Sequence, residues 1–168
     1  MLVGLEILQR LRHSPLRKRL KDSKVGVLTH QAAVTRTGAG LLEILEAQDV
    51  DVRMVFSPEH GFDGLVEAEE PVEKDESPLG DLRVISLYGT TKESLSPKAE
   101  DLEDLDVLVI DLVDVGSRYY TYVWTALLTT RAAHQAGVHV VVLDRWPRQR
   151  RAGLAPLAGG LGVDLRCC

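Results

Sequence analysis

The apolar positions of this chain follow two alternating kinds of pattern. Leucines at positions 2, 5, 8 and 11 recur at helical spacing and predict a short amphipathic helix that ends near Ser14 and Pro15. Two further helices are predicted, over residues 41–47 and from about 120 to 136. Short apolar runs, several of them rich in β-branched residues, predict five strands at residues 25–28, 50–56, 83–88, 107–111 and 138–143.

Strands that alternate with helices indicate a parallel sheet, and continuous apolar runs indicate strands that are buried on both faces. We therefore predict an α/β fold, a Rossmann-like parallel sheet of about five strands with helices on both faces. Residues 1–145 are expected to form one catalytic-type domain. The acidic segment 61–80 is predicted to be a long loop or lid. Residues 146–168, rich in Arg, Gly and Ala without a period, are expected to form an irregular, atypical tail.

Composition narrows the classes of function. The formal net charge of −5 argues against a nucleic-acid partner, and the basic cluster at 17–19 is interpreted as a solvated helix end. The two cysteines are adjacent, at 167 and 168, and predict neither a disulfide framework nor a metal site. No run approaches the roughly 20 apolar residues of a membrane span. We expect a cytoplasmic protein with no membrane partner.

Polar clusters follow four of the predicted strands. They lie at residues 29–31, 57–61, 88–89 and 111–122. In a parallel α/β sheet, ligands bind beyond the carboxyl ends of the strands, where these loops meet. The sequence therefore predicts a site at one edge of the sheet.

Glu59 is the sharpest candidate for chemistry at that edge. It follows Pro58, which fixes the strand exit, and lies two residues before Gly61, which permits a tight turn. A partly buried glutamate can act as a general acid near neutral pH. The alternative is a loop carboxylate that caps a helix. His60 is expected to orient that carboxylate or to bind substrate.

The loop after the fourth predicted strand carries two further carboxylates and most of the tyrosines. Asp111 and Asp114 are candidates for a second catalytic carboxylate, or they bind backbone amides of the turn. Arg118 could clamp a substrate carboxylate. Tyr120 and Tyr122 could stack on a sugar or donate to its hydroxyls, although core packing is the alternative for at least one tyrosine of this loop.

The glycines at residues 37–40 do not match the spacing of a nucleotide-binding motif. The glycines of residues 37–40 come well after the first strand, the third glycine of the dinucleotide fingerprint is missing, and the second strand ends in Phe56 instead of an acidic residue. There is no P-loop and no Gly-x-Ser-x-Gly elbow. No cofactor is expected.

Five segments together resemble the exo-β-N-acetylmuramidases of peptidoglycan recycling, a glycoside hydrolase family formerly described as a domain of unknown function. They are VGVLTHQAAV at 25–34, FSPEHG at 56–61, SLYG at 86–89, DLVDVGSRYYTY at 111–122 and VVLDR at 141–145. The resemblance implies hydrolysis of a non-reducing terminal N-acetylmuramic acid from peptidoglycan fragments, with an amino sugar as the partner. It implies Glu59 as the catalytic carboxylate.

Two sets of site residues follow from the clusters and the resemblance. We expect a catalytic set comprising Glu59, His60, Asp111 and Asp114. We expect a substrate-binding set comprising His30, Gln31, Ser57, Tyr88, Arg118, Tyr120 and Tyr122.

Two departures from the family qualify these expectations. His30 stands where the family usually has asparagine, and family members are much longer, with a second domain. We expect a homologue truncated or frameshifted after about Arg145, with activity in doubt. The alternative is a non-catalytic remnant that binds amino-sugar fragments or a protein partner. Self-association through the surface left by a missing domain is a further expectation, and an NAD-type oxidoreductase is disfavoured by the glycine spacing.

Overall fold

The computed structural model describes residues 2–59, 61–62, 82–89, 91–115 and 120–145. The elements run in the order α1 (Gly4–Arg10), α2 (Pro15–Lys21), β1 (Lys24–Thr29), α3 (Leu41–Glu46), β2 (Asp51–Ser57), β3 (Arg83–Ser86), η1 (Lys92–Leu95), α4 (Ala99–Leu102), β4 (Val107–Asp111), α5 (Tyr122–Gln135) and β5 (His139–Val142). The lid predicted for 61–80 lies mostly, and the tail at 146–168 wholly, outside the described residues.

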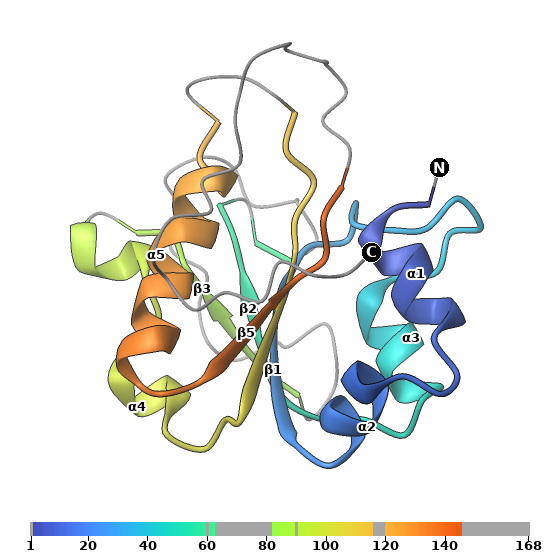
Figure 1. Ribbon diagram of the computed structural model, residues 1–168. Coiled ribbons are helices and arrows are strands. Elements are labelled where there is room, and N and C mark those ends of the chain that lie inside the picture. The colour runs from blue at the N-terminus through green and yellow to red at the C-terminus, as the bar shows by residue number, and fades with distance from the viewer. Residues whose placement is uncertain (1, 60, 63–81, 90, 116–119, 146–168) are drawn as a thin grey trace, which may run out of the picture.

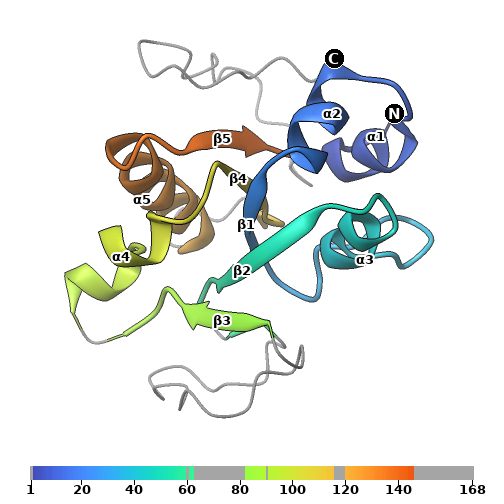
Figure 2. The same ribbon diagram turned by 90° about the horizontal axis from the view of Figure 1, so that it is seen from below.

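The five strands form one parallel sheet in the order β3-β2-β1-β4-β5. Helices α1, α2 and α3 cover one face, and α4 and α5 cover the other (Figures 1 and 2). The predicted α/β, Rossmann-like fold is therefore confirmed. The chain builds outward from β1 to β3 and then returns to place β4 on the other side of β1, so the strand order reverses between β1 and β4.

Each face of the sheet has its own core. Alternate side chains of β1 point to opposite faces, as the pleat requires. Val25 and Val27 join the core beneath α1, α2 and α3, whereas Leu28 joins the core beneath α4 and α5. The central strand β4 is buried along its whole length, which explains why its sequence is a continuous apolar run.

Helix α2 is absent from the predicted elements, because the prediction places Ser14 and Pro15 at the end of the helix before it. They are instead its start: the Ser14 hydroxyl accepts a hydrogen bond from the Arg17 N–H (3.1 Å), and Pro15 occupies the first helical position. The last turn of α2 contains Lys18, Arg19 and Lys21, consistent with the predicted solvated, basic helix end. None of the described helices is long and apolar enough to cross a membrane.

Gly4 fixes the first helix against the end of β5. Its N–H donates to the Asp144 carbonyl (2.7 Å), and a Cβ atom at Gly4 would lie 2.7 Å from the backbone of Leu143 and Asp144. We expect Gly4→Ala to destabilise the fold by about 1–3 kcal/mol, because backbone atoms must move to admit the methyl group. Urea unfolding measures this. Gly40→Ala is the control, since nothing lies within 4 Å of a Cβ there, and equal losses in both variants would contradict the prediction.

Candidate functional site

The candidate site lies at the carboxyl edge of the sheet, beside the reversal of strand order. Thr29, the last residue of β1, is in register with Asp111, the last residue of β4. The ends of these strands point toward the upper edge of the sheet in Figure 1, where α5 also begins. This is the position at which open α/β sheets bind ligands.

Glu59 occupies a tight turn directly after β2. The Gly61 N–H donates to the Pro58 carbonyl (3.2 Å), and Gly61 has a φ of 72°, a left-handed conformation that favours glycine. The Glu59 side chain is half-buried, and its Oε2 accepts a hydrogen bond from the Thr121 hydroxyl (2.7 Å). The Glu59 carbonyl accepts from the Tyr122 hydroxyl (3.3 Å). The start of α5 therefore holds Glu59 at two points.

His30 and the two tyrosines pack beside this turn. The ring of His30 meets the ring of Tyr122 edge to face at 5.0 Å, and Tyr120 lies 4.4 Å from Tyr122. Burial, together with the hydrogen bond to Tyr120 and the charge of Glu59, raises the pKa of Tyr122, so its hydroxyl stays protonated and can donate. The predicted residues His30, Glu59, Tyr120 and Tyr122 are thus brought together.

His30 is held neutral in one tautomer. It is only 8% exposed, and burial, assisted by the charge of Arg145, lowers its pKa to about 4. Its Nε2 accepts a hydrogen bond from the Val113 N–H (3.2 Å), which assigns the proton of the neutral ring to Nδ1. His30 thereby ties the end of β1 to the segment that follows β4.

Asp111 is fully buried and paired. Its two carboxylate oxygens accept from Nε (2.5 Å) and Nη2 (2.8 Å) of Arg145, and Nη1 of Arg145 donates to the Val34 carbonyl (3.1 Å). Burial raises the pKa of Asp111, and the guanidinium opposes this shift. The pair links the segments after β1 and β5 to the end of β4, and the guanidinium engages both carboxylate oxygens of Asp111. A direct catalytic role for Asp111 stays a prediction.

The remaining predicted site residues lie at the same edge of the sheet or outside the part of the chain that the structure describes. Gln31 is exposed, and its N–H donates to the Phe62 carbonyl (2.9 Å), which ties the loop after β1 to the Glu59 turn. Ser57 is buried at the end of β2, whereas Tyr88 and Asp114 are half-exposed. Two predicted residues, His60 and Arg118, lie outside the described residues.

Sequence reasoning missed two residues that support the site, Thr121 and Arg145. Thr121 carries no local signal, because the predicted helix begins at about residue 120 and already includes it. Arg145 ends the VVLDR segment that follows the last predicted strand, where the carboxyl edge lies. Within the described ranges, no group of three His, Cys, Asp or Glu side chains could hold a metal ion.

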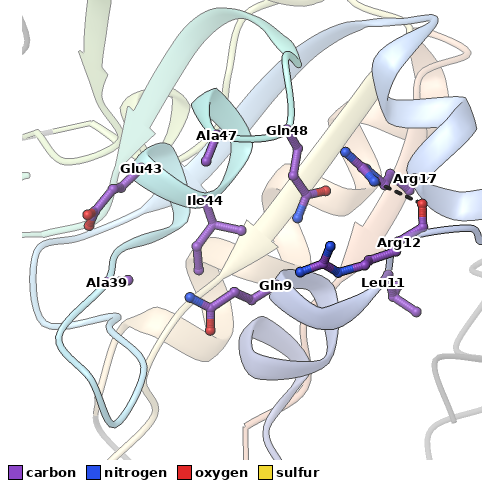
Figure 3. A pocket seen from close by; sticks show the side chains of 9 residues that line it. All are labelled: Gln9, Leu11, Arg12, Arg17, Ala39, Glu43, Ile44, Ala47 and Gln48. Carbon is purple, nitrogen blue, oxygen red and sulfur yellow. Dashed lines mark hydrogen bonds between the residues drawn. The ribbon is translucent and has the colours of Figure 1, made fainter.

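A separate cavity of about 330 Å³ lies between α1, α2 and α3 (Figure 3). Its lining includes Arg12, Arg17, Ile44 and Gln48, and none of the predicted site residues. The Arg17 guanidinium donates to the Arg12 carbonyl (2.8 Å), and the Gln48 amide donates to the Leu8 carbonyl (3.1 Å). These side chains satisfy backbone carbonyls near the end of α1, which is a structural role.

Comparisons with known proteins agree on one family. A family profile described as "Exo-beta-N-acetylmuramidase NamZ, N-terminal" matches residues 25–152. The chain is 36% identical over 130 residues to the peptidoglycan beta-N-acetylmuramidase NamZ of Bacillus subtilis (strain 168), covering 77% of this chain and 31% of that protein.

Two solved structures of DUF1343 family proteins from Bacteroides fragilis NCTC 9343 are also similar. The first has a TM-score of 0.70 at 33% identity and covers 86% of this chain and 34% of its own. The second, with a TM-score of 0.64 at 23% identity, covers 87% and 35% and supports the fold alone. The chain thus spans about a third of the length of these relatives. It belongs to the family of the N-terminal domain of the exo-β-N-acetylmuramidase NamZ.

Proposed function

We propose that this domain hydrolyses the glycosidic bond of a non-reducing terminal β-N-acetylmuramic acid in peptidoglycan fragments, with Glu59 as the catalytic carboxylate. The observation that carries the proposal is the placement of Glu59. A half-buried carboxylate lies at the carboxyl edge of the sheet, where open α/β sheets generally bind ligands, and it accepts hydrogen bonds from Thr121 and, through its backbone, from Tyr122. The family membership and the similarity to a peptidoglycan beta-N-acetylmuramidase support the substrate class.

The chemistry needs more than one group. Glycoside cleavage requires an acid for the leaving oxygen, together with a base, a nucleophile or the substrate's own acetamido group. Since Asp111 is engaged by Arg145, the half-exposed Asp114 is the better candidate among the described aspartates of this loop for the second carboxylate. Tyr120, which is half-exposed, offers an aromatic ring on which a sugar could stack.

Substitution of Glu59 tests the proposal. We expect the full chain to release N-acetylmuramic acid from a chromogenic β-muramide, and Glu59→Gln to lower that rate at least a hundredfold. Glu46→Gln is the matched control, because Glu46 is an exposed glutamate on α3, and it should leave the rate unchanged. Circular dichroism checks that each protein is folded. A Glu59→Gln variant as active as the control would refute the role of Glu59.

A second candidate function is binding without catalysis. Val123, Trp124 and Leu127 lie on the side of α5 that faces away from the sheet, and Trp124 is 60% exposed. An exposed apolar surface of this kind is typical of an interaction site, and the chain spans about a third of the length of its relatives. A folded chain that releases no N-acetylmuramic acid would favour this second candidate, in which amino-sugar fragments or a protein are bound and left intact.

A further inference from the structure

Thr121 stands at the N-cap of α5, yet its hydroxyl does not cap the helix. Its backbone is already helical (φ −75°, ψ −20°), and its side chain makes no hydrogen bond to the first turn. Ser14, at the start of α2, has the extended backbone typical of an N-cap, and its hydroxyl accepts from the helix. The Thr121 hydroxyl instead donates to Oε2 of Glu59, 62 residues away, at 2.7 Å.

Hydrogen bonds to the next turn of α5 hold the backbone of Thr121, and so position its hydroxyl. The Thr121 carbonyl accepts from both the N–H (2.9 Å) and the hydroxyl (3.2 Å) of the buried Thr125, one helical turn further on. The next residue, Tyr122, is buried and donates to the Glu59 carbonyl. Thr121, which donates to the Glu59 side chain, and Tyr122, which donates to the Glu59 backbone, are therefore adjacent residues at the start of α5.

We propose that Thr121 is a positioning residue, whose hydroxyl fixes the direction in which the Glu59 carboxylate faces. The inference rests on the proposed function of Glu59. A glutamate side chain has several rotatable bonds, and a hydrogen bond from a fixed donor to one carboxylate oxygen restricts that freedom before substrate arrives. Since Thr121 acts through Glu59, its loss should slow the chemical step and leave substrate binding nearly unchanged.

Three variants test this assignment. Thr121→Val keeps the shape and removes the donor, so kcat should fall roughly 10- to 100-fold with KM within about twofold. Thr121→Ser keeps the donor and should restore kcat to within about threefold of the wild type. Thr130→Val is the matched control, because it removes a hydroxyl bond of the same length on the same helix, to the Ala126 carbonyl (2.7 Å), and should leave kcat unchanged.

Assays of Glu59→Gln in parallel distinguish the positioning role of Thr121 from the proposed function of the domain. If Glu59→Gln is inactive and Thr121→Val matches Thr130→Val, the positioning role is wrong and the proposed function stands. If Glu59→Gln retains full activity, the catalytic role of Glu59 is wrong, and the positioning role of Thr121 falls with it. A folded wild type that releases no N-acetylmuramic acid would refute the proposed function itself. Adding Thr121→Val to Glu59→Gln should cause no further loss, because the hydroxyl has no carboxylate left to position.

Crystal structures of the variants test the positioning role of Thr121 without an activity assay. In Thr121→Ser the Glu59 Oε2 should remain within hydrogen-bond distance of the hydroxyl at position 121. In Thr121→Val the carboxylate should turn to a different rotamer or occupy more than one. An unchanged Glu59 side chain in the valine variant would overturn the inference.

Discussion

Replacement of Asp111 by alanine is expected to lower the free energy of unfolding by about 3–5 kcal/mol. The reason is that the Arg145 side chain, only 12% exposed, would lose both of its hydrogen bonds to a carboxylate and remain as a buried charge without a partner. Its remaining described bond, to the Val34 carbonyl, cannot neutralise it. Urea unfolding at neutral pH measures the loss.

Two further variants distinguish the contribution of this buried ion pair to stability from that of an exposed ion pair. Arg145→Met leaves Asp111 buried, and burial raises the pKa of that carboxyl; the variant's deficit should therefore shrink as the pH falls, whereas that of Asp111→Ala should not. Lys21→Met breaks a surface pair with Asp49 and should cost no more than about 1 kcal/mol. An Asp111→Ala loss as small as that of Lys21→Met would show that the Arg145 pair does not brace the sheet edge.

Much of the fold was predictable because its signals are local. The fully buried β4 is an apolar run rich in β-branched residues that ends in an aspartate, and the predicted strand 107–111 has the observed bounds. The alternation of strands and helices then placed His30, Glu59 and Tyr122 at one edge, where the structure brings them together. The strand order depends on tertiary packing and has no local signal. Helix α2 has one in Ser14 and Pro15, but the same two residues are also typical of a helix end.

The details of the site depend on contacts that no local pattern encodes. Asp111 and Arg145 are 34 residues apart, and Thr121 and Glu59 are 62 apart. An aspartate at the end of a strand looks the same in sequence whether it faces a ligand or a buried guanidinium. The choice is made by the side-chain direction and by the partner that the fold supplies. This is why the sequence predicts the place of Asp111 at the edge but not its pairing with Arg145.

His30 is expected to make the fold sensitive to acid. Its folded-state pKa of about 4 lies below the ordinary value of 6.5, so the unfolded chain takes up a proton at a higher pH than the folded one does. Stability is therefore lost as the pH falls from about 6.5 to about 4, and this residue should contribute a loss on the order of 3 kcal/mol. Urea midpoints measured across that interval report it.

The comparison that isolates this effect is between the wild type, His30→Asn and His13→Asn. Asparagine at position 30 can still accept from the Val113 N–H through its side-chain oxygen but has no titrating group, so its stability should fall less steeply over the same interval. His13 is exposed in the loop between α1 and α2, and His13→Asn should follow the wild-type curve. If all three slopes agree, the buried imidazole does not control acid stability. If only His30→Asn is flatter, the protonation that weakens the fold also removes the acceptor that ties β1 to the segment after β4, beside Tyr122 and the Glu59 turn that it supports.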